Sequence, residues 1–156
     1  MAEALLRDQL RRADPPLPDS NGWRVTSAGT WAMAGDRASE FGRWAMARRG
    51  LDLSAHRSRI VTAEMLAEAD LVLVMTRSHR EALCAEFPAA SGKIHLLAQM
   101  AGPAFDVPDP FGSSMADYEQ TARELEDLIA RGLPTIRRLA DGAEETGRPE
   151  TGKRGV

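Results

Sequence analysis

Cysteine is almost absent from this chain. The 156 residues contain a single Cys, which cannot form an internal disulfide, so a disulfide framework is excluded and a reducing, cytoplasmic compartment is expected. An excess of basic residues is also lacking: 20 Lys and Arg stand against 23 Asp and Glu, a net charge of −3 that argues against nucleic acid as a partner.

Long apolar runs are missing as well. None approaches the ~20 residues that a membrane helix needs, so no membrane association is expected. Residues 1–12 are amphipathic and charged, unlike the unbroken apolar run of a signal peptide.

The three His lie far apart without metal-ligand spacing, and we therefore expect no metal and no other cofactor.

What is present is enough for one domain, which we place at residues 1–140. From Asp141 onward the sequence is polar and glycine-rich, which predicts a disordered tail over residues 141–156. The composition does not indicate an oligomeric state.

Helical patterns alternate with short apolar stretches along the domain. This alternation predicts an α/β fold, a small doubly wound parallel sheet flanked by helices. Three strands are few for the helices that accompany them, so either one strand is unrecognised or the chain lacks one. The predicted strands are 23–28, 70–75 and 93–97. The predicted helices are 1–12, 38–49, 62–67 and 78–86, and Thr62 is the expected N-cap of the third. A last helix is predicted to start at Ser113 or Ser114 and to be kinked or restarted by Gly132 and Pro134.

Ligands of doubly wound sheets bind at the carboxyl ends of the strands. The predicted loop 100–112 leaves such an end and carries Asp106 and Asp109 between prolines. A carboxylate held there could serve as a general acid if its surroundings keep it protonated. An Asp before Pro is also a common turn starter, and the spacing alone favours that simpler role.

Several motifs follow one another in a recognisable order. Residues 1–5 (MAEAL), 27–30 (SAGT), 50–59 (GLDLSAHRSR), 70–75 (DLVLVM) and 109–112 (DPFG) together resemble the low-molecular-weight protein tyrosine phosphatase family, over residues 1 to about 139. The resemblance implies a four-stranded parallel sheet and metal-free hydrolysis of phosphomonoesters on a phosphorylated protein through a cysteinyl-phosphate. Phe111, where eukaryotic members usually have Tyr, indicates the bacterial branch, which includes protein arginine phosphatases; phosphotyrosine and phosphoarginine both stay open.

The resemblance also assigns roles to individual residues. Asp109 would be the general acid, which protonates the leaving phenolate or amine and then activates the hydrolytic water. Trp31 and Phe111 would wall the substrate cleft and bind the flat part of the substrate, although they could equally be ordinary loop aromatics. Asp106, His56 and Arg57 are expected to brace turns and loops.

The family's phosphate-binding loop is not found in this sequence. In the family, a central strand and a Cys, five residues and an Arg, followed by Ser-Pro, stand before the motif that occupies residues 1–5 here. Cys84 is no substitute, because Ala90 stands where the Arg is required and Cys84 falls in a predicted helix, where we expect a small buried apolar residue. The chain as given is therefore expected to lack its nucleophile, its anion site and its first central strand, to be inactive, and to begin at a misplaced start.

Two alternatives remain. The chain could be a non-catalytic, phosphatase-like binding protein. It could also resemble the thioredoxin-coupled arsenate reductases of the same fold, but their relay needs further cysteines and this chain has one.

Overall fold

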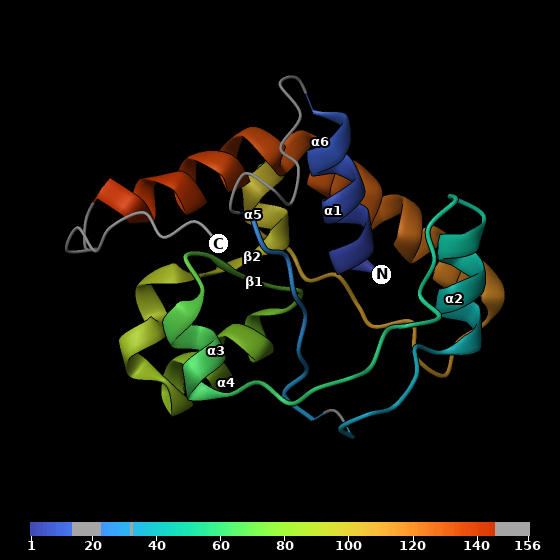
Figure 1. Cartoon of the computed structure of the whole chain (residues 1–156), viewed down its shortest axis with the longest axis horizontal. Helices are drawn as coiled ribbons and strands as arrows, with labels where there is room; N and C mark the ends of the chain where they lie inside the picture. The colour runs from blue at the N-terminus through green and yellow to red at the C-terminus, as the bar shows by residue number, and fades with distance from the viewer. Residues whose placement is uncertain (14–22, 32, 146–156) are drawn as a thin grey trace, which may run out of the picture.

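The computed structural model describes residues 1–13, 23–31 and 33–145. In Figure 1, α1, α5 and α6 lie on one side of two short strands, and α3 and α4 lie on the other. The predicted α/β class with a small, open parallel sheet is confirmed. The elements in chain order are α1 (Ala2–Arg12), α2 (Glu40–Ala47), α3 (Ala63–Glu68), β1 (Val72–Val74), α4 (Arg77–Glu86), the 3-10 helix η2 (Pro88–Lys93), β2 (Ile94–Leu96), α5 (Leu97–Ala101) and α6 (Met115–Glu145).

The sheet of the described residues consists of β1 and β2, paired in parallel with Val72 opposite Ile94. The prediction of a strand at 23–28 is wrong, because this segment pairs with no strand among the described residues. Arginine side chains take the place of a neighbouring strand. The carbonyl of Val25 accepts from Arg7 Nη2 at 2.6 Å, and the carbonyl of Ser27 accepts from Arg59 Nε at 3.2 Å.

Short polar side chains determine where the helices begin. Thr62 Oγ1 accepts from the N–H of Met65 at 3.2 Å, so the predicted N-cap of α3 is confirmed. Thr76 Oγ1 caps α4 in the same way, at 3.2 Å from the N–H of His79. At the start of α6 the hydroxyl of Ser114 bonds the Asp117 carboxylate at 2.6 Å.

The long helix α6 differs from its prediction in two ways. It continues through Gly132 and Pro134 to Glu145, so it does not restart there. A Cβ at Gly132 would lie 2.7 Å from the Cβ of Met100, which shows that this glycine allows α5 to pack closely against α6. Residues 141–145 are helical and correct that part of the predicted tail, whereas 146–156 lie outside the described residues.

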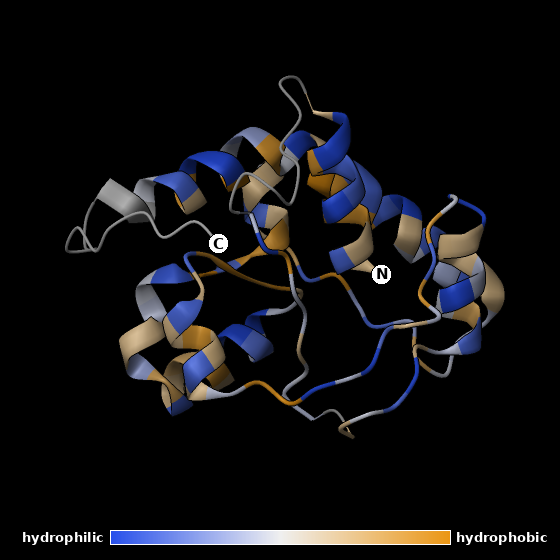
Figure 2. Cartoon of the chain, viewed as in Figure 1, coloured by the Kyte–Doolittle hydropathy of each residue, from blue (hydrophilic) through white to orange (hydrophobic). Residues whose placement is uncertain are grey.

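Two apolar clusters stabilise the two sides of the molecule. The larger one, here called the helical core, joins α1, α2, α5 and α6, and the smaller strand core lies between the strands, α3 and α4. Figure 2 shows apolar colour on the inward sides of these elements. The buried residues of the helical core are Leu5, Ala45, Met46, Leu97, Ala98, Met100, Val107, Ala122, Leu125, Leu128, Ile129 and Ile136; those of the strand core are Leu66, Val74, Leu83, Ala90, Ile94 and Leu96.

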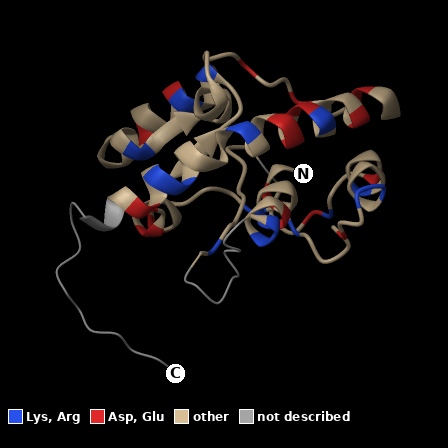
Figure 3. Ribbon diagram, turned by 90° about the horizontal axis from the view of Figure 1, so that it is seen from above, with Lys and Arg blue, Asp and Glu red and all other residues tan. Residues whose placement is uncertain are grey.

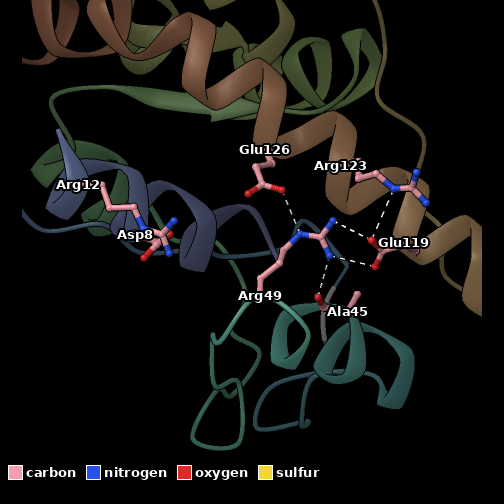
Figure 4. Close-up of polar contacts among 7 residues, drawn as sticks. All are labelled: Asp8, Arg12, Ala45, Arg49, Glu119, Arg123 and Glu126. Carbon is pink, nitrogen blue, oxygen red and sulfur yellow. Dashed lines mark hydrogen bonds and ion pairs between the residues drawn. The ribbon is translucent and has the colours of Figure 1, made fainter.

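An ion-pair network fastens the end of α2 to α6 (Figure 4). Arg49 donates to both carboxylate oxygens of Glu119, each at 3.0 Å, and its Nε donates to Glu126 at 3.1 Å. The Arg49 and Glu119 side chains are only 13% and 19% exposed. The hydrogen bond from Arg49 lowers the pKa of Glu119 below its ordinary value. Elsewhere positive and negative side chains are interspersed along the helices (Figure 3).

Candidate active site

The loop between α5 and α6 is attached to the carboxyl end of β1. The N–H of Val107 donates to the carbonyl of Met75 at 2.9 Å, and the Val107 side chain is buried in the helical core. Asp106 Oδ1 accepts from the N–H of Arg77 at 3.0 Å, at the first turn of α4. Arg77 Nη2 in turn donates to the carbonyl of Ala104 at 2.9 Å. Asp106 therefore has the structural role that the sequence predicts, and it holds the loop in place.

Asp109 follows three residues later on this anchored loop. Its Oδ1 accepts from the N–H of Phe111 at 2.9 Å, and Pro110 between them is buried. The turn that the sequence favoured is therefore present. Asp109 is exposed, and its Oδ2 has no hydrogen-bond partner in the described part of the chain. This second oxygen is free to contact a ligand.

The start of α1 lies close to Asp109. Burial lowers the pKa of the Met1 amino group, while the nearby carboxylates of Glu3 and Asp109 act to raise it. Met1 is the N-cap residue of α1 and provides no side-chain cap. The first N–H groups of a helix lack intrahelical partners and favour negative charge. The Asp109 carboxylate is thus one of the charges that act on this end of α1.

Glu3 connects this helix end to two loops. Its carboxylate accepts from the Ser27 hydroxyl and lies 3.9 Å from Nδ1 of His56. Arg57 Nη1 donates to the carbonyls of Ser54 and His56, at 3.0 and 2.7 Å. The predicted bracing by hydrogen bonds is confirmed for Arg57, whereas the His56 side chain makes no hydrogen bond among the described residues. Sequence reasoning missed the roles of Glu3 and Ser27, because their residue types alone do not reveal a contact between a helix and a distant loop.

The two aromatic residues expected in a substrate cleft are strongly exposed. Phe111 is 79% exposed and lies beside Asp109 through the shared turn. Trp31 is 95% exposed on a different loop, the one between residue 29 and α2. No hydrogen bond or ring contact joins Trp31 to Asp109 among the residues that the structure describes. A shared role in binding substrate stays a prediction.

Cys84 is not part of this group of residues. It lies on α4 and packs against the strand core, as predicted for an apolar helical residue, but it is only half-buried and not buried as expected. Ala90, six residues later, is in η2 and carries no charge. The described residues contain no grouping of three His, Cys, Asp or Glu side chains that could hold a metal ion, and no helix among them is long and apolar enough to cross a bilayer.

Comparison with known proteins identifies the family. The family model of low molecular weight phosphotyrosine protein phosphatases matches residues 1–140. The chain belongs to this family. A probable low molecular weight protein-tyrosine-phosphatase, EpsP, from Ralstonia nicotianae is 31% identical over 139 residues, which cover 89% of this chain and 88% of that protein.

Relatives named as arginine phosphatases are about equally similar. A protein-arginine-phosphatase from Geobacillus stearothermophilus is 36% identical over 132 residues, 84% of this chain and 82% of that protein. The solved structure of the YwlE arginine phosphatase has a TM-score of 0.77 and 34% identity, covering 88% of this chain and 89% of that chain. It is a variant in which serine replaces a cysteine and the active-site serine is phosphorylated. These similarities support the bacterial branch of the family.

Proposed function

We propose that this phosphatase-family chain supplies the general acid and the leaving-group side of a protein phosphatase site specific for phosphotyrosine or phosphoarginine. One observation carries the proposal: Asp109 stands exposed in a turn of a loop that hydrogen bonds of Val107 and Asp106 anchor to the end of β1 and the start of α4. The free Oδ2 of Asp109 can hold the proton that a leaving group requires.

The proposed reaction has two steps. A cysteine thiolate attacks phosphorus and the bond from phosphorus to the phenolate oxygen or guanidinium nitrogen breaks, while Asp109 donates its proton to that atom. Asp109, now a carboxylate, then takes a proton from the water that attacks the cysteinyl-phosphate, which releases inorganic phosphate and the thiolate. The phosphorylated active-site serine of the arginine phosphatase variant supports a covalent intermediate in this family.

The 156 residues do not contain the thiolate of the first step. Their single cysteine, Cys84, packs against apolar side chains of the strand core, and the position six residues later is Ala90. A nucleophile of this kind needs a lowered pKa and a neighbouring cation for the phosphate oxygens. We therefore propose that these residues alone do not hydrolyse phosphate esters.

The lack of a thiolate nucleophile among these residues also supports a second candidate, a phosphatase-like protein that binds partners without turnover. The two candidates differ in what an added nucleophile loop does. Placing a family-type strand, Cys, five residues, Arg, Ser and Pro ahead of Met1 would restore turnover in the first case only. A stable extended protein with no turnover would favour the binding protein.

The role of Asp109 is tested in that extended protein. We expect Asp109→Asn to slow hydrolysis of an ester with a poor leaving group, such as a phosphotyrosine peptide, by ~10²–10⁴-fold. Hydrolysis of p-nitrophenyl phosphate should suffer less, because its leaving group needs little protonation. Asp127→Asn, on the exposed face of α6, is the matched control and should have no effect. Equal losses on both substrates would contradict the general-acid role.

A further inference from the structure

An exposed apolar surface surrounds Trp31. Trp31 is 95% exposed, Met33 75% and Ile60 50%, which places three of the most exposed large apolar side chains on two neighbouring segments. The segments are joined because Gly29 pairs with Ile60. In Figure 1 they cross at the edge of the molecule remote from α6. Exposed apolar patches of this kind mark interaction sites on soluble proteins.

Arginine side chains accompany these apolar residues. Arg37 and Arg57 pair through their backbones, and Arg59 precedes Ile60 directly. All three arginines are exposed and none forms an ion pair with a carboxylate among the described residues. Arg57 and Arg59 do donate to backbone carbonyls, those of Ser54 and His56 and that of Ser27. The nearby stretches 33–37 and 57–60 contain one carboxylate, Asp36. The region is therefore locally positive on a chain whose net charge is −3.

Hydrogen bonds of Ser58 hold the segments in a fixed arrangement. Its N–H donates to the carbonyl of Asp36 at 2.8 Å, and its carbonyl accepts from the N–H of Gly35 at 2.8 Å. Its hydroxyl accepts from the N–H of Asp36 at 3.0 Å and donates to the carbonyl of Met33. A surface that is held in place before binding loses less conformational entropy when a partner arrives.

We propose that this region, the Trp31 surface, binds an acidic segment of a partner protein. The Trp31 surface consists of Trp31, Met33, Ile60, Arg37, Arg57 and Arg59. Trp, Met and Arg are the side chains enriched at protein interfaces, and Trp and Arg dominate binding energies there. Arginines that have no carboxylate partner within the described chain select carboxylates on the partner, and the apolar side chains select an apolar residue between them. This activity requires no turnover and no contribution from Asp109, and it gives Trp31 a different role from the substrate wall that the resemblance implies.

The test measures binding by the chain as it stands. The probe is a fluorescein-labelled peptide in which Glu and Asp surround one Leu, compared with the same peptide carrying Gln and Asn in place of the acids. We expect the acidic peptide to bind, the neutral one to bind at least ~10-fold more weakly, and affinity to fall as salt is added.

Variants locate the binding site. We expect Trp31→Ala and Arg37→Ala each to weaken acidic-peptide binding ~10-fold. Neither side chain has a hydrogen bond or ion pair within the described chain, so both variants should stay folded, as circular dichroism can verify. Arg138→Ala, an exposed arginine of α6 without an ion pair there, is the matched control. Equal binding of the neutral peptide, or unchanged binding by both variants, would overturn the proposal. So would self-association that Trp31→Ala abolishes, because it would assign the surface to a second copy.

Discussion

The loop that carries Asp109 and the loop that carries Trp31 are held in different ways. The Asp109 loop inserts Val107, which is 2% exposed, into the helical core and bonds to the end of β1. The Trp31 loop contributes no buried side chain between residues 33 and 37 and depends on the hydrogen bonds of Ser58. The first loop is thus part of the folded core, whereas the second is displayed on the surface. Substitutions in the first should change stability, and substitutions in the second should change mainly binding.

The ion pair of Arg49 with Glu119, which joins the end of α2 to α6, provides the largest expected effect. Glu119→Gln removes the charged partner of Arg49 and should lower the free energy of unfolding by about 1.5–3 kcal/mol at neutral pH. Because the folded protein lowers the pKa of Glu119, this contribution is present above the ordinary pKa of Glu and disappears as pH falls through the lowered value. Urea unfolding of both proteins should therefore give a difference that shrinks toward acid pH. A constant difference would contradict the ion-pair account.

The anchoring of the Asp109 loop gives the next effect. Val107→Ala should cost about 1–2 kcal/mol of unfolding free energy, because a buried side chain is truncated in the helical core. Met33→Ala on the Trp31 loop is the matched control, and at 75% exposure it should change stability by less than about 0.5 kcal/mol. If the two substitutions cost the same, the contrast between the loops would be wrong.

The smallest effect concerns the hydrogen bonds of Ser58. Ser58→Ala removes the hydroxyl contacts with Asp36 and Met33, at a cost of about 0.5–1 kcal/mol. Hydrogen exchange of the Asp36 amide should become faster, while the amide of Val107 keeps its protection. Loss of protection at Val107 as well would show that the two loops are coupled.

Local signals in the sequence predicted much of the fold. Thr62 and Ser114 identify helix starts because capping depends on neighbouring residues. The strand at 23–28 was predicted wrongly, since a β-branched, alternating stretch becomes a strand only where a partner strand pairs with it. Helix α5 was missed: its apolar residues continue directly from β2, and a single short helical turn has little periodicity of its own.

The candidate site shows the same limit. The short motif at 109–112 indicated Asp109 by resemblance, and the structure places it in a local turn. The contacts that position it are not local: Arg77 meets Asp106, 29 residues away, and Glu3 meets Ser27, 24 residues away. Residue types alone do not predict such long-range contacts, because these contacts depend on how the whole chain folds.

The central claim is that these 156 residues carry the acid of a phosphatase site without its nucleophile. The most direct measurement is hydrolysis of p-nitrophenyl phosphate by the purified chain in the presence of EDTA. We predict no turnover above the buffer rate. Turnover that persists in EDTA and is abolished by Cys84→Ser would contradict the account, because it would make the half-buried cysteine of α4 the nucleophile.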